Sequence, residues 1–302
     1  MAYRNNFDVI ITGGSYAGLS AAMALGRALR SVLIIDSGKP CNSQTPHSYN
    51  FITHDGETPK AIADKAREQV LAYDTIKFHQ GLATKGIKTE NGFEITTAAN
   101  EVFTAKKLLF ATGVTDIMPG IAGFADCWGI SVLHCPYCHG YEVKHQPTGL
   151  IGNGDLGFEL SRLISNWSKN LVLFTNGRST LTAEQTEKIT SHHIEIIENE
   201  IMSFTHTNGY IQQVVFADGS ARNISAVYAR PAFQQHCAIP EALGCELTEQ
   251  GYIKTDDFQR TSVHGVYAAG DSTTMFRAVS AAVAAGGKSG ATINKELIEE
   301  EF

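Results

Sequence analysis

The chain has 302 residues, which is long enough for one large domain or two ordinary domains with buried cores. Its 43% hydrophobic and 18% charged residues are typical of a globular protein, and a net charge of −7 without any basic cluster argues against a polyanion as the main partner. The N-terminal sequence lacks the apolar core of a signal peptide and no apolar run could cross a bilayer, so we expect a cytoplasmic protein.

The first part of the chain has the layout of a dinucleotide-binding unit. Apolar runs at 7–12 and 32–36 are typical of buried parallel strands, and the segment between them has helical spacing. A glycine-rich turn, GGSYAG at 13–18, precedes the helix, and Asp36 ends the second strand. Such a turn admits a pyrophosphate at a helix N-terminus, and the carboxylate can bind a ribose hydroxyl. Ser15 replaces the usual middle glycine, so an ordinary strand–turn–helix unit is the alternative.

The next segments predict a helix, short strands and a crossover. Residues 58–73 have the spacing of an amphipathic helix, and short strands with an Asn-Gly turn fill 76–110. Gly and Pro accumulate over 113–123, where we expect the chain to pass into a second domain.

A second glycine loop follows, this time with every glycine of the pattern. Gly152, Gly154 and Gly157 come after an apolar strand and open a helix, and another strand occupies 171–174. Two such units in one chain indicate an internal duplication. Near the C-terminus an apolar strand ends in Gly270-Asp271, which on its own could be an ordinary helix N-cap, and an Ala/Gly-rich helix is predicted over 278–291.

Between the two glycine loops lies the sequence HCPYCHGYE, in which Cys135 and Cys138 are separated by two residues and His139 follows. The spacing fits a redox disulfide, half a zinc site or a haem attachment site. A zinc site needs a second ligand pair, which is not recognisable here, and haem attachment needs export, for which there is no signal. We therefore favour a redox pair and no metal. The other four cysteines, at 41, 127, 237 and 245, show no pairing pattern.

Taken in order, these motifs resemble the low-molecular-weight thioredoxin reductase family over nearly the whole chain. The most specific parts are the position of the CxxC and the segment GYIKTDDFQRTSVHGVYAAGD. The resemblance implies an α/β fold of two Rossmann-like, three-layer ββα dinucleotide-binding domains, with the second inserted into the first. The FAD domain would comprise 1–115 and 243–302, and an NAD(P)-type domain at 116–242 would carry the cysteines.

The resemblance also implies roles for individual residues. Cys138 would lie against the flavin and Cys135 would exchange with the substrate. Gly152, Gly154 and Gly157 would belong to an NAD(P) site. The residues implied to hold or approach FAD are Gly13, Gly14, Ser15, Tyr16, Ala17, Gly18, Asp36, Asn50, His54, Thr112, Gly113, Gly270, Asp271, Ala278 and Val279.

Two details resemble one branch of that family, the dithiol oxidases of the gliotoxin and holomycin type and their bacterial relatives. These details are the segment CNSQTPHSYNFITHDGETP at 41–59 and the sequence CHGYE. Thioredoxin reductases carry Asp directly after the CxxC, where this chain has His139. The branch assignment gives His139 the acid–base role, with His134 as the competing candidate, and places His47, Asn50 and His54 in a loop near the flavin.

The source of electrons is the open question of the sequence. NADPH-dependent family members carry His-Arg-Arg after the strand that follows the second glycine loop, whereas this chain has Thr175-Asn176-Gly177 and then a single Arg178. A 2′-phosphate is best held by paired cations. The second domain could bind NADH or NADPH in an unusual way, be vestigial with oxygen as acceptor, or give way to a protein donor such as a ferredoxin.

We therefore predict an FAD-dependent thiol–disulfide oxidoreductase, with a preference for dithiol oxidation by oxygen over NAD(P)H-dependent disulfide reduction. A flavin-containing redox sensor is the alternative from another class. The substrate would be a small dithiol or disulfide or a thioredoxin-like protein, and the family resemblance suggests a homodimer.

Overall fold

The computed structural model describes residues 5–302, which divide into two compact units. Unit 1 comprises the chain up to Ser43, Lys60–Thr115 and Phe233–Phe302, and unit 2 comprises Gln44–Pro59 and Asp116–Ala232. This division differs from the expected one in two places. The chain returns to unit 1 at Phe233 rather than at 243, and the segment Gln44–Pro59 groups with unit 2.

Unit 1 is built on a seven-stranded sheet in the order β3-β2-β1-β6-β5-β4, with β17 also pairing with β6. The strands β3, β2, β1, β6 and β17 run parallel, whereas β4 and β5 are antiparallel to their neighbours. The strands β1 and β2 have the mostly buried, largely branched side chains expected where helices cover a parallel sheet. The strands of this sheet are β1 (Asn6–Thr12), β2 (Val32–Asp36), β3 (Ile76–Gln80), β4 (Ala83–Thr89), β5 (Gly92–Thr97), β6 (Val102–Phe110) and β17 (Val266–Ala268).

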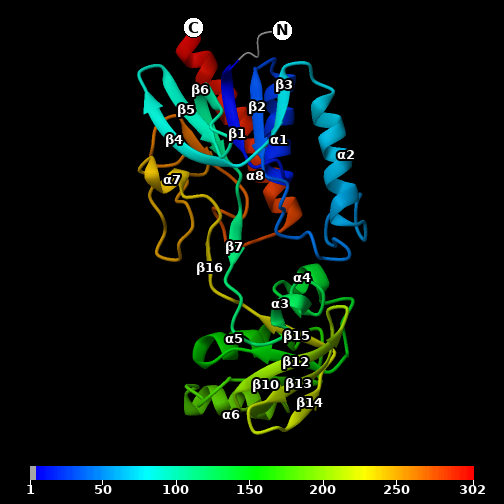
Figure 1. The fold of residues 1–302 in the computed structure, drawn as a ribbon. Coiled ribbons are helices and arrows are strands. Elements are labelled where there is room, and N and C mark those ends of the chain that lie inside the picture. The colour runs from blue at the N-terminus through cyan, green and yellow to red at the C-terminus, as the bar shows by residue number, and fades with distance from the viewer. Residues whose placement is uncertain (1–4) are drawn as a thin grey trace. The chain divides into compact units, whose positions relative to one another are not determined.

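The helices α1 (Tyr16–Arg27) and α8 (Val279–Glu301) pack against each other in unit 1, as the blue and red helices of Figure 1 show. Glycines on α8 permit this close approach: a Cβ on Gly286 would overlap the carbonyl oxygen of Ala17, and one on Gly290 would lie 2.7 Å from that of Ala21. The contact brings the first glycine loop and the N-terminus of α8 together. The remaining helices of unit 1 are α2 (Pro59–Leu71) and α7 (Ile239–Ala242).

Unit 2 repeats this plan with an all-parallel sheet in the order β11-β10-β9-β15-β8. A three-stranded antiparallel sheet, β12-β13-β14, packs on it through a shared apolar cluster. The strands are β8 (Val132–Leu133), β9 (Thr148–Ile151), β10 (Leu171–Phe174), β11 (Glu195–Ile197), β12 (Ile201–Thr207), β13 (Tyr210–Phe216), β14 (Ala221–Asn223) and β15 (Ala226–Ala229). The helices are α3 (Phe124–Cys127), α4 (Pro136–His139), α5 (Gly154–Ile164) and α6 (Ala183–Ser191). The internal duplication expected from the two glycine loops is therefore visible in the strand orders.

The chain leaves unit 1 through β7 (Val114–Asp116) and returns through β16 (Phe233–Gln235), and these strands pair as a two-stranded sheet. This is the segment where the accumulated Gly and Pro predicted a crossover. Among residues 5–302, no helix combines the length and apolarity needed to span a membrane.

Candidate active site

Cys135 and Cys138 form a disulfide at the start of α4, with their Cα atoms 5.3 Å apart. Cys135 is the N-cap of this single helical turn and Pro136, which has no N–H to lose, occupies its first position. The backbone N–H of Cys138 lies 3.2 Å from Cys135 Sγ. Both cysteines are half-buried, so the disulfide is held in a defined geometry but is not sealed within the core.

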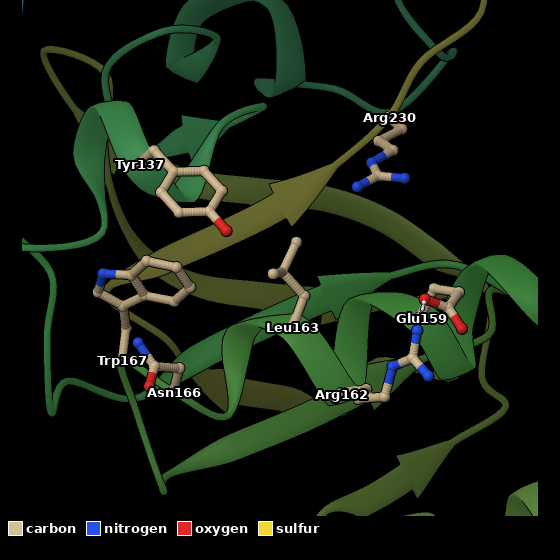
Figure 2. A pocket seen from close by; sticks show the side chains of 7 residues that line it. All are labelled: Tyr137, Glu159, Arg162, Leu163, Asn166, Trp167 and Arg230. Carbon is tan, nitrogen blue, oxygen red and sulfur yellow. Dashed lines mark hydrogen bonds and ion pairs between the residues drawn. The ribbon is translucent and has the colours of Figure 1, made fainter. Parts of the chain in front are cut away.

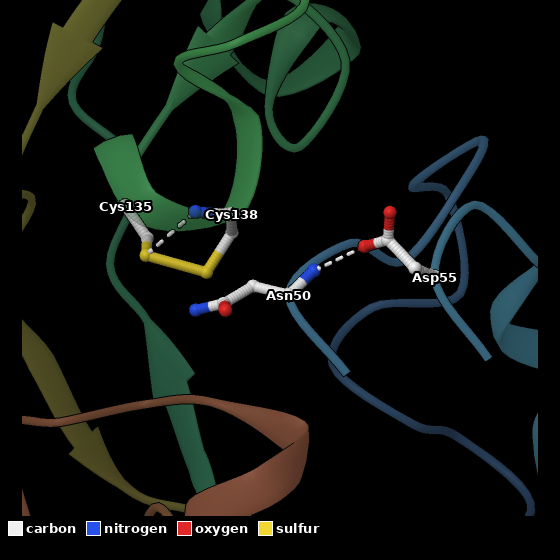
Figure 3. Close-up of a disulfide and its surroundings, with 4 residues drawn as sticks. All are labelled: Asn50, Asp55, Cys135 and Cys138. Carbon is white, nitrogen blue, oxygen red and sulfur yellow. Dashed lines mark hydrogen bonds between the residues drawn. A yellow bond between two sulfur atoms is a disulfide. The ribbon is translucent and has the colours of Figure 1, made fainter. Parts of the chain in front are cut away.

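The loop Gln44–Pro59 of the same unit faces the disulfide. Its Gln44 side chain donates to the backbone carbonyls of Ala125 and Trp128, which ties the loop to the α3 region. Asn50 adopts a left-handed backbone (φ 57°), and its N–H donates to Asp55 Oδ1 at 2.7 Å. In Figure 3 the Asn50 amide points toward the Cys135–Cys138 disulfide. The predicted role of Asn50 and His54 was cofactor contact, and the structure places both on this loop of unit 2.

His139 is the imidazole that the sequence placed in the acid–base position. It is half-buried, and burial lowers its pKa below the ordinary value, so the ring is neutral near pH 7 and can accept a proton. Tyr49 of the facing loop meets it edge-on, with ring centroids 6.2 Å apart. His134 lies edge-on to Trp128 at 6.4 Å.

A pocket of about 490 Å³ borders the CxxC turn, whose Tyr137 forms one wall. Tyr137 meets Trp167 edge-on with centroids 5.4 Å apart, and Figure 2 shows both rings at the edge of the pocket, with Arg230 at the opposite side. Arg162 is paired with Glu159 at 2.6 Å. Trp167 also supports the CxxC turn, because a Cβ on Gly140 would lie 2.7 Å from its ring. The pocket therefore shares its aromatic wall with the redox turn.

The first glycine loop, in unit 1, is open to an anionic ligand. Among the described residues, no side chain caps α1: Ser15 makes no cap hydrogen bond, and the first turn holds no acidic residue. The loop is close-packed, since a Cβ on Gly13 would overlap the carbonyl oxygen of Ala111 and one on Gly18 that of Gly13. A helix N-terminus without a side-chain cap, approached by a tight glycine turn, fits a pyrophosphate.

Other predicted residues of unit 1 gather around this loop. Asp36 accepts the N–H of Gly14 at 2.6 Å and that of Gly38 at 2.7 Å, which leaves carboxylate lone pairs for a ribose hydroxyl. Gly270 has a positive φ of 85° and lies beside Ala17, so that Asp271 follows at the same end of α1. The buried Thr112 Oγ1 has no hydrogen-bond partner in the described chain, which fits a group contributed by a bound ligand. The unit 1 site therefore fits a dinucleotide.

The second glycine loop is different, because its own side chains close it. Asn153 is the N-cap of α5, and its Oδ1 accepts the N–H of Gly154 at 2.9 Å and both the N–H and the hydroxyl of Thr180, at 2.8 and 3.0 Å. Its amide donates to the carbonyl of Arg178 at 2.9 Å. Asp155 adds a carboxylate to the first turn of α5 and is bound by Gln185 at 2.7 Å. Asn153 therefore occupies the Gly154 N–H, and the Asp155 carboxylate lies at the N-terminus of α5, where the helix dipole would favour the negative charge of a pyrophosphate.

The segment that follows β10 also packs against the second glycine loop. Thr175 donates to the carbonyl of Gly177 at 2.7 Å, and Asn176, with a φ of 51°, accepts the N–H of Ile201 at 2.7 Å. These contacts hold the segment against the rest of unit 2. As a result, a Cβ added to Gly154 would lie 2.9 Å from the Thr180 hydroxyl oxygen. Gly152, Gly154 and Gly157 form the expected tight turn, and Asn153 and Thr180 are hydrogen-bonded to each other across it.

Comparison with known proteins identifies the family. A family model described as pyridine nucleotide-disulphide oxidoreductase matches residues 7–286. The chain belongs to this family. It is 30% identical to thioredoxin reductase aclD of Aspergillus oryzae, with 98% of each chain covered, and 31% identical to thioredoxin reductase tcpT of Claviceps purpurea, with 99% of this chain and 97% of the relative covered.

Solved structures agree with the sequence relatives. A putative thioredoxin reductase TrxB from Bacillus anthracis superposes with a TM-score of 0.94 at 31% identity, covering 98% of this chain and all of that one. HlmI superposes with a TM-score of 0.93 at 30% identity, covering 100% of this chain and 95% of that one. The expected thioredoxin reductase-like fold of two Rossmann-like domains is confirmed, and the protein is an oxidoreductase acting on sulfur groups.

The cysteines, His139, Asn50 and the glycine loops could be identified from the sequence. The side chains that contact His139, Asn50 and the second glycine loop could not. The sequence alone predicts no role for Tyr49, Asp55 or Thr180, and the glycine pattern does not specify Asn153 or Asp155. One signal was present for the second loop. Asn at an N-cap followed by Asp in the first turn is a strong helix start. It indicates that side chains of the helix itself accept hydrogen bonds from, or compensate the charge of, its N-terminal N–H groups.

Proposed function

We propose that this protein is an FAD-dependent dithiol oxidase that uses oxygen as the electron acceptor. The observation that carries the direction is the closure of the second glycine loop by Asn153, Asp155 and Thr180. An NAD(P)H-dependent disulfide reductase of this family would need a nicotinamide dinucleotide at that position to supply electrons. A dithiol oxidase receives its electrons from the substrate and needs only the unit 1 cofactor.

The redox pair supports this exchange with the residues already described. One thiolate of the substrate attacks Cys135 Sγ, the disulfide bond breaks, and its electron pair leaves on Cys138 Sγ as a thiolate. The second substrate thiol then attacks the mixed disulfide, which forms the substrate disulfide and releases Cys135 as a thiolate. His139 accepts a substrate thiol proton, which its neutral state at pH 7 permits. The substrate loses two electrons and the cysteine pair gains them.

FAD would lie in unit 1, where it would supply the two-electron acceptor that returns the cysteine pair to the disulfide and passes the electrons to oxygen. The glycine loop would hold its pyrophosphate at the N-terminus of α1, Asp36 its adenosine ribose, and Thr112 would donate to it. The other residues that we assign to FAD are Gly13, Gly14, Ser15, Tyr16, Ala17, Gly18, Gly113, Gly270, Asp271, Ala278, Val279 and, from the loop of unit 2, Asn50 and His54.

The alternative is disulfide reduction, with a small disulfide or a thioredoxin-like protein as substrate and NAD(P)H or a protein such as a ferredoxin as donor. The relatives named thioredoxin reductase favour it. The resemblance of CHGYE and the 41–59 segment to the gliotoxin- and holomycin-type dithiol oxidases favours oxidation, as does the missing phosphate clamp at Thr175–Arg178. We also propose a homodimer, on family resemblance alone.

Oxygen uptake tests the proposal. Purified, FAD-loaded protein should consume oxygen and release hydrogen peroxide when given dithiothreitol as a generic dithiol. NADPH should not drive reduction of a chromogenic aromatic disulfide. Cys138→Ser should abolish the dithiol-dependent uptake, which also separates an enzyme from a redox sensor. NADPH-dependent disulfide reduction that exceeds dithiol oxidation would establish the reductase instead.

A further inference from the structure

The loop Gln44–Pro59 contains a hydrogen bond between Asn50 and Asp55. Asn50 adopts a left-handed backbone, which asparagine tolerates better than most non-glycine residues and which local contacts can hold in place. Its N–H is held by the Asp55 carboxylate at 2.7 Å, across the turn of the loop. The loop is closed below this contact by the pairing of Ser48 with Glu57, whose backbone N–H and carbonyl groups lie 2.8 Å apart.

The consequence of this conformation is the direction of the Asn50 side chain. The Asn50 side chain is exposed, makes no hydrogen bond to any of the described residues 5–302, and points toward the Cys135–Cys138 disulfide (Figure 3). An amide NH₂ is a good donor to a thiolate. A donor aimed at a disulfide has no strong acceptor until the disulfide opens and one sulfur takes up negative charge.

We propose that Asp55 is a positioning residue that holds Asn50 in its left-handed conformation, so that the Asn50 amide donates to the thiolate formed when the disulfide opens. This inference rests on the proposed function only in assuming that the CxxC pair undergoes thiol–disulfide exchange, in either direction. When the S–S bond breaks, its electron pair goes to the leaving sulfur, and the amide N–H stabilises that charge without transferring a proton. Asp55 itself touches neither cysteine in this account.

Two substitutions of Asp55 separate the effect of its negative charge from its role as a hydrogen-bond acceptor. A carboxylate near a cysteine pair would by its charge disfavour a thiolate, whereas the hydrogen bond to Asn50 favours it by placing the amide. Asp55→Asn removes the charge and keeps an acceptor oxygen, and Asp55→Ala removes both. Glu57→Ala is the matched control, since it removes a carboxylate from the same loop whose contact is with His54 Nδ1 at 3.2 Å.

The test is the rate of alkylation of the reduced full-length, FAD-loaded protein by iodoacetamide between pH 5 and 9 under anaerobic conditions, with Cys135 and Cys138 followed separately by peptide mass spectrometry. Asn50→Ala should lower the rate of the more reactive cysteine about ten-fold at neutral pH, the effect of losing one charge-assisted hydrogen bond. It should also shift the pH dependence of the alkylation rate to higher pH. Asp55→Ala should reproduce both effects, the double variant should add nothing, and Asp55→Asn and Glu57→Ala should react like the wild type.

Three results would overturn the inference: normal reactivity in Asp55→Ala, equal defects in Asp55→Asn and Asp55→Ala, or additive defects in the double variant. Alkylation of a reduced cysteine requires neither dithiol turnover nor oxygen nor NADPH. A failure here therefore concerns Asp55 and Asn50 alone, and a failure of the oxidase proposal would leave this result unchanged.

Discussion

The packing of α8 against α1 predicts opposite effects for two neighbouring glycines. A Cβ on Gly290 would lie 2.7 Å from the carbonyl oxygen of Ala21 and 2.9 Å from the Cβ of Ala24, closer than these atoms can approach. A Cβ on Gly287 would meet only the Ser20 hydroxyl, at 3.3 Å, and a side-chain hydroxyl can adjust. Each substitution by alanine gains about 0.5–1 kcal/mol because alanine favours a helix more than glycine does.

For Gly290→Ala the gain is exceeded by the steric cost. Overpacking against a fixed backbone costs about 1–3 kcal/mol, so we expect a net destabilisation of about 1 kcal/mol or more. Gly287→Ala should leave stability unchanged or raise it by up to about 1 kcal/mol. Thermal and urea unfolding of both variants, followed by circular dichroism and by release of flavin fluorescence, measures the difference. Equal stability of the two variants, or a more stable Gly290→Ala, would refute the packing argument.

Four further outcomes are expected. Gly286→Ala, whose Cβ would overlap the Ala17 carbonyl in the first glycine loop, should reduce FAD content more than Gly290→Ala does, as measured by flavin absorbance of the purified proteins. Because burial lowers the pKa of His139, the imidazole stays neutral as the pH falls below its ordinary value near 6.5. Any inflection that His139 causes in the pH profile of dithiol oxidation should therefore lie below 6.5, and a His139-dependent inflection above that ordinary value would contradict the assignment. Burial raises the pKa of Cys127 to about 11, so iodoacetamide at pH 8 should label the exposed Cys41 and leave Cys127 unmodified. Asn153→Ala, which removes the N-cap that fills the second glycine loop, should weaken the closure and lower stability by about 1 kcal/mol, as measured by urea unfolding.

Much of the fold could be predicted because it follows from local patterns. The strands at 32–36 and 171–174 and the helix near 58–73 were read from apolar periodicity, and the structure has them at Val32–Asp36, Leu171–Phe174 and Pro59–Leu71. The C-terminal helix was expected to end at 291 and continues to Glu301. The segment after 291 is rich in Glu, which favours helix without adding to the Ala/Gly pattern on which the prediction relied.

The missed parts of the site depend on contacts between residues distant in sequence. The loop Gln44–Pro59 lies in the N-terminal part of the chain yet groups with unit 2, because Gln44 bonds to carbonyls more than eighty residues away. The second glycine loop matches its sequence pattern completely and is nevertheless closed, since a pattern of glycines does not record what Asn153 and Thr180 do across the turn. The first loop departs from the pattern, with Ser15 in place of glycine, yet no side chain caps the helix that follows it.

The central claim is that electrons enter from a dithiol and not from a nicotinamide nucleotide bound to unit 2. Anaerobic titration of the FAD-loaded protein with NADPH, NADH and dithiothreitol, followed by flavin absorbance, tests it most directly. We expect the flavin absorbance to be bleached by the dithiol alone and to recover fully when air is admitted. Rapid, stoichiometric bleaching by NADPH or NADH would contradict it.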